Sequence, residues 1–466
     1  MFLFTHLPFE IQHRVLFFLY SHRDVAALSV QCRSLHVLCN MPLRKRYRRI
    51  RITSSRKSFN RAFNMLLDIL TKPGLGEHVR HIEYTKECCA NEPNPEQPRR
   101  ELSGEEMQLL RAATRRAGFV DAEGLRVIDL LLQLVNLDVH KYATRGLAPE
   151  EVGFPLYQLL YRNNTSPQES LFLQHLRSVY MININKDYLD DGRCYSFMDF
   201  TGALAMFHRL PSINSVSVDL LLEMPYATPV AEIAESNVSR IAIHHSSITS
   251  MYLASLICSC KALREFEYSI GGRSRTPPAV SFFNVKTFIK AILMHKETLE
   301  ILDVDVEEDM GYLFKVDSST RDRCLDVQYG QREAEVGRSG PPPVAMWDQS
   351  GSLRDFHALK RLSLGVHFLM YFARGVKPTH DGSFSLVDCL PESLESLCIR
   401  GYERGKSEEN DSQVDALVAL QKRATSKLKT IIGIEALIPN SKHVDYPDNG
   451  RHLLWIMQER EWSDED

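Results

Sequence analysis

A short apolar phrase recurs along most of this 466-residue chain: an apolar residue, two variable residues, an apolar residue, one variable residue and a third apolar residue. The phrase is not selective by itself, because a chain that is 44% hydrophobic gives about 40 such matches by chance. Its context adds weight, since helix-like stretches at 252–260 and 288–295 precede two of the copies. The copies are Val79-Ile82-Tyr84, Leu134-Leu137-Val139, Leu176-Val179-Met181, Ile213-Val216-Val218, Val238-Ile241-Ile243, Leu263-Phe266-Tyr268, Leu299-Leu302-Val304, Leu359-Leu362-Leu364 and Leu394-Leu397-Ile399.

The order of helix, turn and short strand resembles leucine-rich repeats, in which parallel strands line a concave face and helices back them. First positions at 176, 213, 238, 263 and 299 give spacings of 37, 25, 25 and 36 residues. The longer spacings exceed the usual repeat of roughly 20–29 residues, and the closing asparagine is missing. The resemblance therefore implies an α/β fold, an irregular horseshoe of degenerate repeats. The alternative is a doubly wound α/β sheet, which also alternates strand and helix. The short strands and the absence of a glycine-rich phosphate turn count against that alternative.

The first fifty residues predict three short helices. The first has apolar residues at Leu7, Ile11, Val15, Phe18 and Leu19, the stripe of an amphipathic helix. Asp24 is a suitable N-cap for the second helix. The third runs through Cys32, Leu35 and Leu38 and is expected to stop near Asn40 and Pro42. Three helices of this size bury little surface alone, so we expect a partner or a following domain to cover their remaining apolar face.

These residues resemble the F-box motif, and the match covers about a tenth of the chain. It is formed by Leu7-Pro8-Phe9-Glu10-Ile11, Val15-Leu16, Leu19, Asp24-Val25, Leu28-Ser29, Cys32-Arg33 and Leu35-His36-Val37-Leu38, and residues 47–52 resemble the step into the first repeat strand of fungal members. Gln31 and Leu35 depart from the usual pattern, which has an apolar residue and an aromatic residue there.

The resemblance implies a binding role and no catalytic residues: an F-box docks on the Skp-type adaptor of a cullin–RING ubiquitin ligase. The residues expected in that contact, or in the small core beneath it, are Leu7, Pro8, Ile11, Val15, Leu19, Leu28, Cys32 and Leu35. The alternative is an ordinary helical cap on a repeat array, since terminal repeats are atypical.

Composition and charge suit a soluble globular protein with reduced thiols. The formal net charge of −3 favours neither nucleic acid nor anionic membrane, and the ten scattered cysteines do not form a disulfide framework. No apolar run reaches the roughly 18 residues of a spanning helix, so we expect no membrane segment and a cytoplasmic or nuclear location. The basic run at 44–51 is interpreted as a solvated edge, with nuclear import or phosphate binding as the alternative.

The expected domains are an F-box at 1–48, degenerate repeats at 49–440 and an acidic C-terminal tail at 441–466. Three stretches within the repeats are interpreted as insertions: 86–105, 141–169 and 306–352. The last opens with Glu307-Glu308-Asp309 and contains Gly340-Pro341-Pro342-Pro343, so we expect it to lie outside the packed core.

The sequence contains no catalytic motif of the nucleotide-binding, hydrolase or zinc-protease types. A zinc site from His244, His245, Cys258 and Cys260 has poor ligand spacing, and packing of both cysteines in a helix is the preferred interpretation. A hard-cation site from Asp303, Asp305 and the acidic residues that follow is explained more simply by a strand running into an acidic loop. We therefore expect no cofactor, no metal and no enzymatic activity.

Two functions remain: a substrate receptor of a ubiquitin ligase, or a repeat scaffold without a ubiquitin role. Both need a protein partner, whose identity the sequence does not specify. If the phrases are parallel strands, Ile241 and Ile243 face the core and Arg240 faces outward, because neighbouring side chains alternate between the faces. Arg240 is therefore the predicted target-binding residue; Arg264, Glu300 and Lys360 hold related positions in their own copies.

Overall fold

The computed structural model of the chain consists of two compact units. The N-terminal unit comprises Met1–Leu156 with Ile456–Asp466, and the repeat unit comprises Tyr157–Trp455. This division differs from the predicted one, in which a single repeat region began at residue 49. The described residues are 7–8, 11–12, 15–16, 22–47, 49–52, 56–79, 81–84, 102–116, 176–182, 196–198, 200–219, 221–223, 234–271, 283–307, 344–376, 384–423 and 426–441.

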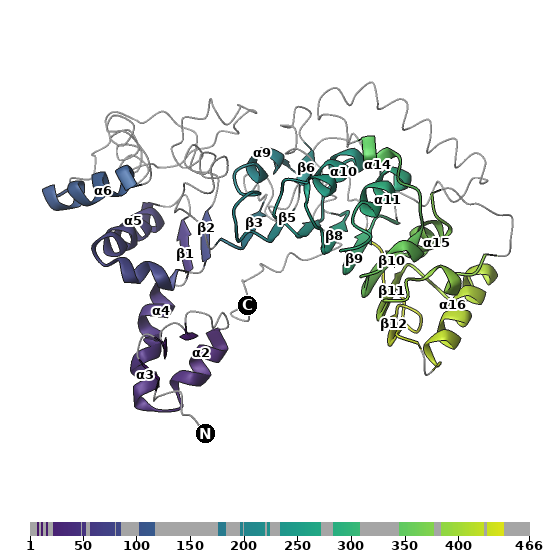
Figure 1. Ribbon diagram of the computed structural model, residues 1–466, viewed down its shortest axis with the longest axis horizontal. Helices are drawn as coiled ribbons and strands as arrows, with labels where there is room; N and C mark the ends of the chain where they lie inside the picture. The colour runs from purple at the N-terminus through teal and green to yellow at the C-terminus, as the bar shows by residue number, and fades with distance from the viewer. Residues whose placement is uncertain are drawn as a thin grey trace, which may run out of the picture. The chain divides into compact units, whose positions relative to one another are not determined.

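The N-terminal unit begins with short helices around a small apolar core. Residues 11–12 and 15–16 are helical, and α2 (His22–Ser29), α3 (Arg33–Cys39) and α4 (Met41–Tyr47) follow (Figure 1). The core consists of buried side chains from these helices: Leu16, Val25, Leu35, Leu38 and Cys39. The predicted third helix ends where expected, because Asn40 adopts the left-handed conformation (φ 43°) that terminates a helix.

Two details of these helices differ from the prediction. Asp24 lies within the first turn of α2 instead of capping it, since the helix already begins at His22. Pro42 does not end the helical region, because it occupies the second position of α4, where a proline displaces no hydrogen bond. The first half of the basic run at 44–51 therefore belongs to a fourth helix. Tyr47 is buried at its end, and its hydroxyl donates to the Asp68 carboxylate at 2.7 Å.

The rest of the described N-terminal unit pairs two strands and two helices. Strand β1 (Arg49–Ile52) pairs in parallel with β2 (His81–Tyr84), and α5 (Arg56–Thr71) and the short helix η2 (Pro73–His78) connect them. Helix α6 (Gly104–Arg116) packs Leu110 against Phe63 of α5. In the described residues this sheet has two strands and is separate from the sheet of the repeat unit.

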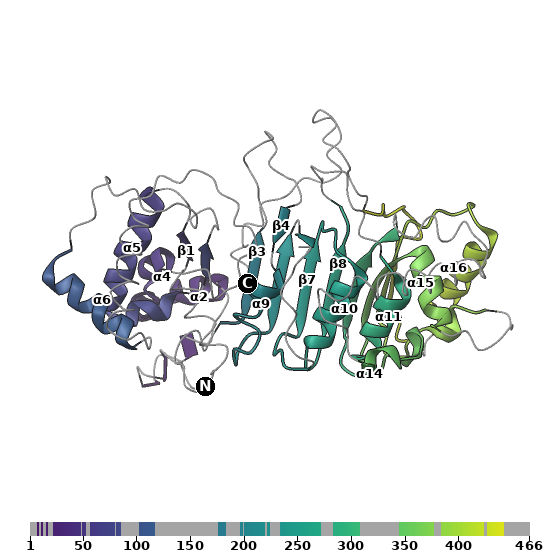
Figure 2. The same ribbon diagram turned by 90° about the horizontal axis from the view of Figure 1, so that it is seen from above.

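The repeat unit contains an eight-stranded parallel sheet whose strands lie side by side in sequence order (Figure 2). The strands are β3 (Ser178–Ile182), β5 (Ser215–Asp219), β7 (Arg240–His244), β8 (Glu265–Ser269), β9 (Ile301–Asp305), β10 (Arg361–Gly365), β11 (Ser396–Arg400) and β12 (Thr430–Ile432). A doubly wound sheet reverses its strand order at a switch point. The unbroken order excludes that alternative and leaves the predicted parallel array.

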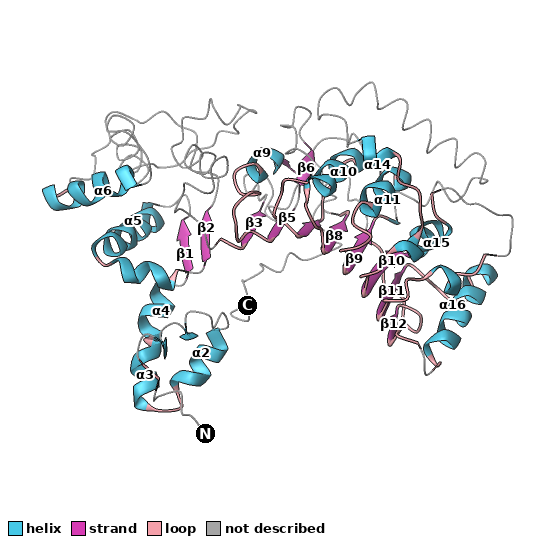
Figure 3. Ribbon diagram, in the orientation of Figure 1, coloured by secondary structure: helices cyan, strands magenta, loops and turns pink. Residues whose placement is uncertain are grey.

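Helices cover one face of this sheet. Helices α9 (Phe200–Leu204), α10 (Ser250–Ser259), α11 (Val285–Leu293), α14 (Val344–Trp347), α15 (Val366–Arg374) and α16 (Glu408–Gln421) all lie on the same side of the strands (Figure 3). Side-chain caps start several of them: Thr249 accepts from the Tyr252 amide and Asn284 from the Thr287 amide. Helices α10 and α11 occupy the two helix-like stretches that the sequence predicted.

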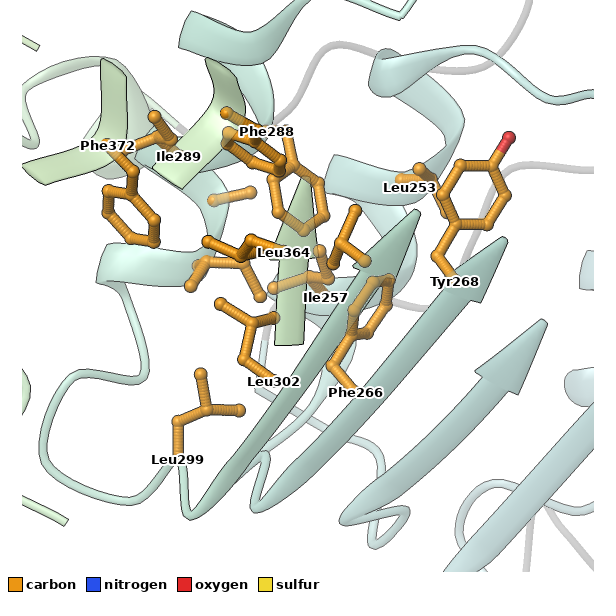
Figure 4. Close-up of a cluster of buried hydrophobic side chains, with 14 of the residues drawn as sticks. Leu253, Ile257, Phe266, Tyr268, Phe288, Ile289, Leu299, Leu302, Leu364 and Phe372 are labelled. Atoms are coloured by element: carbon orange, nitrogen blue, oxygen red, sulfur yellow. The ribbon is translucent and has the colours of Figure 1, made fainter. Parts of the chain in front are cut away.

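The main core lies between the sheet and these helices. The second and fourth residues of β7, Ile241 and Ile243, are buried, and the same alternation holds in β5, β8, β9, β10 and β11. Figure 4 shows Phe266 and Leu302 of neighbouring strands pointing toward Ile257 and Phe288 of the helices. Replacing a buried phenylalanine of this kind with alanine costs about 3–5 kcal/mol, so the apolar phrase largely determines the stability of the repeat unit.

The predicted insertions and the tail lie largely outside the described residues. The described residues do not include 141–169, 308–343 or 442–466. Most of 86–105 is also outside them, but α6 begins at Gly104, near the end of that stretch. The ends of the insertion at 306–352 correct the prediction that it lies outside the core. Val306, Glu307 and Met346 are buried, and Met346 belongs to the core of the repeat unit. A further two-stranded sheet pairs β4 (Ser196–Met198) with β6 (Leu221–Glu223).

Candidate functional site

The face of the sheet opposite the helices is the first candidate site. Because side chains alternate between the two faces of a strand, the first, third and fifth residues of each strand belong to this concave face. In each strand of the eight-stranded sheet from β5 to β11, strand residues one and three are exposed or half-buried. The face is polar, and its residues come from strands that are distant in sequence. A broad polar surface of this kind is suited to binding a partner.

The starts of the strands carry a row of compensated ion pairs. Glu300 contacts Lys360 at 2.8 Å and Arg264 at 3.0 Å, and Lys429 lies 3.3 Å from Glu395. The hydrogen bond from Lys360 and the nearby Arg264 lower the pKa of Glu300. Exposed pairs of this kind contribute about 0–1 kcal/mol each. The carboxylates of the row are thus all compensated by cations, and the row adds little to stability.

Arg240, the predicted target-binding residue, lies at the start of β7 on the concave face. Its side chain is 53% exposed, and its Nε atom lies 3.3 Å from the Glu265 carboxylate on β8. Ile241 and Ile243 are buried, so the predicted orientation of this strand is confirmed. Arg264 and Lys360 are also exposed, and both bind the half-buried Glu300. A role for Arg240 in target binding stays a prediction.

Further along the strands, acidic side chains gather around one arginine. Arg400 of β11 donates through Nη2 to the Asp303 carboxylate at 3.2 and 3.3 Å and through Nε to the Ser363 hydroxyl at 3.2 Å. Its Nη1 atom lies 3.8 Å from Asp305. In the strand register Asp303 stands directly opposite Glu267 of β8. Sequence reasoning considered Asp303 and Asp305 only as metal ligands and missed Arg400 and Glu267, whose proximity depends on strand pairing.

Asp305 is the most buried member of this group. Its side chain is 3% exposed, and one carboxylate oxygen, Oδ2, accepts the Ser441 amide at 2.9 Å. No described residue donates a hydrogen bond to its other oxygen, Oδ1. Burial raises the pKa of this carboxyl, against the opposing effect of Ser441 and Arg400. An unmatched buried acceptor is unfavourable and rare, which makes it informative about binding.

The two histidines at the end of β7 adjoin this group. The Nδ1 atom of His245 lies 2.9 Å from Asp219, and the Nε2 atom of His244 lies 3.4 Å from Glu267. Cys258 and Cys260 are instead packed in the core, on α10 and at its end, where burial raises the pKa of both thiols to about 12. Without a bound metal, both thiols are protonated at neutral pH. Over the described ranges, no group of three or more histidine, cysteine or carboxylate side chains is placed to hold a metal ion.

The second candidate site is the outer surface of the N-terminal helices. Ile11 and Val15 are one turn apart and are 44% and 38% exposed, whereas the neighbouring Leu16 is buried in the small core. Leu7 and Pro8 are held at the helix start, since the Gln12 side chain donates to the Leu7 carbonyl at 2.7 Å and two helical amides donate to the Pro8 carbonyl. This helix therefore presents apolar side chains both inward and outward.

The structure separates the eight predicted adaptor-binding residues by exposure. Pro8, Ile11, Val15 and Cys32 are exposed, Leu7 and Leu28 are half-buried, Leu35 is buried in the core, and Leu19 lies outside the described residues. Two further apolar residues that were not predicted, Val30 and Val37, are strongly exposed. Helical spacing could have found Val37, which falls between the inward-facing Leu35 and Leu38.

Comparison with known families identifies the C-terminal part of the repeat unit. Residues 337–442 match a leucine-rich repeat domain. The match spans α14, β10, α15, β11, α16 and β12, and confirms the predicted leucine-rich repeats over that stretch. It does not extend to the N-terminal helices. No curated protein and no solved structure matches the chain.

The leucine-rich repeat match indicates that the concave face is a surface for binding partners. Repeat proteins of this architecture bind their partners on an extended concave surface. The chain therefore contains a protein-binding repeat module, and the polar side chains of its parallel strands are the candidate contacts. None of the described helices is both long enough and apolar enough to cross a bilayer.

Proposed function

We propose that this protein is the substrate-recognition subunit of a cullin–RING ubiquitin ligase of the SCF type. The N-terminal helices dock on the Skp-type adaptor, and the leucine-rich repeats hold the protein to be ubiquitinated. The subunit itself is not an enzyme; it brings the target to the ligase. It acts in the cytoplasm or the nucleus, with no nucleic acid, membrane or cofactor in its role.

The observation that carries the proposal is the exposed apolar pair Ile11 and Val15 within the F-box-like motif. Among the described residues, the small core beneath the pair has five buried apolar side chains, and neither Ile11 nor Val15 belongs to it. Apolar side chains one helical turn apart and open to solvent are suited to a groove on a partner. The F-box resemblance supplies the identity of that partner.

Capture of a Skp-type adaptor by the purified full-length chain tests the proposal. Buried apolar anchors at interfaces each contribute more than about 1 kcal/mol, so Ile11→Ala combined with Val15→Ala is expected to weaken capture at least about tenfold. The matched control is Leu437→Ala, which shortens an exposed apolar side chain of the repeat unit. The control should capture the adaptor like the unaltered protein. Unchanged capture by the double variant would remove the adaptor role.

A non-catalytic repeat scaffold without a ubiquitin role is the second candidate. It is favoured by the extent of the family match, which lies wholly in the repeats. A scaffold has no need of the adaptor, whereas a substrate receptor must co-purify with it. Purification of the tagged chain from cells that express the adaptor separates the two functions.

A further inference from the structure

Two carboxylates stand directly opposite each other on the concave face. Glu267 is the third residue of β8, Asp303 is the third residue of β9, and the two are register partners. Neighbouring strands are about 4.8 Å apart, and like charges at opposite positions destabilise a sheet. A well-folded repeat has no structural need for such a pair. Local conflicts of this kind in natural proteins concentrate where a ligand relieves them.

Arg400 compensates this acidity only in part. It contacts Asp303 and Asp305, and it is the only lysine or arginine among the described concave positions in the outer halves of the strands from β5 to β11. The carboxylates there are Asp219, Glu267, Asp303 and Asp305. Four carboxylates against one guanidinium give a formal charge of three negative, counting the carboxylates and the guanidinium alone. We call these four carboxylates with Arg400 the acidic band.

Asp305 provides an independent sign that the band takes a hydrogen-bond donor. Its position in β9 directs it to the same face as Asp303, two residues earlier. The side chain is 97% buried, yet its Oδ1 atom has no hydrogen-bond donor among the described residues. Leaving a buried acceptor unmatched costs about 1–3 kcal/mol. A donor brought by a ligand would recover that free energy.

The width of the acidic band indicates an extended ligand. Its carboxylates come from β5, β8 and β9, and β7 lies between β5 and β8. Three strand spacings amount to roughly 14 Å, which is too far for the coordination shell of one metal ion. A peptide segment that crosses the strands can place basic side chains along this distance.

We propose that the acidic band binds lysine or arginine side chains of a protein target, in a segment that runs across the strands. This inference rests on the target-binding half of the proposed function and specifies the chemistry of the target. One basic side chain lies between Glu267 and Asp303, and a donor from the segment reaches the Oδ1 atom of Asp305. The ion pairs at the strand starts flank the segment without attracting it, because their carboxylates are already compensated by cations.

Binding of a fluorescent peptide of alternating arginine and serine to the full-length chain tests the inference by fluorescence anisotropy. Glu267→Gln and Asp303→Asn are each expected to weaken binding about fivefold or more, because each removes one charge-assisted contact. Glu300→Gln and Glu395→Gln make the same change in net charge at the strand starts, and are the matched controls. They should change binding less than about twofold, because those carboxylates lie at the strand starts, outside the acidic band. Peptides of alternating glutamate and serine should not bind.

Three results would overturn the inference: no binding of the basic peptide, preference for the acidic peptide, or equal weakening by the test and control variants. The melting temperature of Glu267→Gln checks that the protein still folds. It should be unchanged or raised, because the substitution removes one of two like charges at opposite register positions. Adaptor capture by the same preparations separates the two proposals. Loss of peptide binding with intact capture shows a failure of this inference alone, whereas peptide binding without capture shows a failure of the adaptor role.

Discussion

The Glu307 carboxylate accepts a hydrogen bond from the backbone amide of His367 at 2.9 Å, although 60 residues separate the two in the sequence. The ring of His367 and the amide of Phe368 bond to the same carboxylate. Both amides belong to the first turn of α15, where backbone N–H groups have no acceptor within the helix. No side chain at the N-cap of α15, Gly365, performs this function. Glu307 therefore caps α15 from the end of β9.

Glu307→Ala is expected to lower the free energy of unfolding of the repeat unit by about 2 kcal/mol, because it leaves the two amides without an acceptor. Glu307→Gln retains one acceptor oxygen and should recover part of this loss. Urea unfolding followed by circular dichroism measures both variants. Equal stability of all three proteins would show that the cap is unimportant.

Gly365→Ala provides a coupled control for that prediction. A Cβ atom at Gly365 would lie 1.9 Å from the Oε2 atom of Glu307, so the carboxylate would have to move. Gly365→Ala should lower the free energy of unfolding of the unaltered protein, and should lower it less in the Glu307→Ala variant. The effects of two substitutions at residues in contact are not additive. Additive losses would contradict the direct contact.

The segment 308–343 is expected to be dispensable for folding, whereas the whole stretch 306–352 is not. Replacing 308–343 by a short Gly/Ser linker should shift the melting temperature by less than about 3 °C, a change of roughly 1 kcal/mol for a domain of this size. Deleting 306–352 removes the buried Val306, Glu307 and Met346 and should prevent cooperative melting. Loss of folding on the smaller deletion would place a structural repeat within it.

His208 predicts a loss of stability in mild acid. Burial, with a smaller effect from Arg209, lowers its pKa to about 4 from the ordinary 6.5. A lowered folded-state pKa means that the unfolded chain binds the proton first, so stability is complete above pH 6.5 and falls as the pH approaches 4. Between pH 7 and pH 5 the loss from this residue is about 2 kcal/mol. His208→Gln should reduce the difference in unfolding free energy between these pH values by that amount. An unchanged pH dependence would contradict the assignment.

Leu35 and Ile11 are expected to affect adaptor capture in different ways. Leu35→Ala removes a buried side chain and should destabilise the N-terminal helices by about 2–5 kcal/mol. Ile11→Ala should weaken capture and leave helix stability within about 0.5 kcal/mol, because the side chain is exposed. Thermal melting and adaptor binding of the same two proteins distinguish a core residue from an interface residue. Reversed results would exchange their roles.

Arg240→Glu is expected to disrupt target capture without changing stability by more than about 0.5 kcal/mol, the usual range for a surface substitution. The matched control is Arg404→Glu, which reverses another exposed arginine of the repeat unit, paired with Asp415. Quantitative pull-down of the target with both variants is the measurement. A crosslinking map that places the target on the helices would remove Arg240 from the site.

The positions of the strands could be predicted from local sequence. Eight of the nine apolar phrases lie on strands that begin two residues after the first apolar position, and the phrase at Leu134 lies outside the described residues. The pattern succeeds because alternation of side chains between two faces is a property of each strand by itself. The strand β12 was missed because Gly433 stands where the third apolar residue is expected. A Cβ atom there would lie 2.0 Å from the Ile399 carbonyl oxygen, and the backbone φ is +89°.

The sequence by itself determined most strands of the eight-stranded sheet, the side chains by which they enter the core and the helical stripe that precedes the repeats. Each follows from a periodicity within about ten residues, where backbone geometry relates side chains directly. Only the tertiary structure decided that Glu267 meets Asp303, that Arg400 joins them and that Glu307 caps α15. These contacts depend on how strands pair across loops of unequal length, and loop length affects closure entropy too weakly to specify the register.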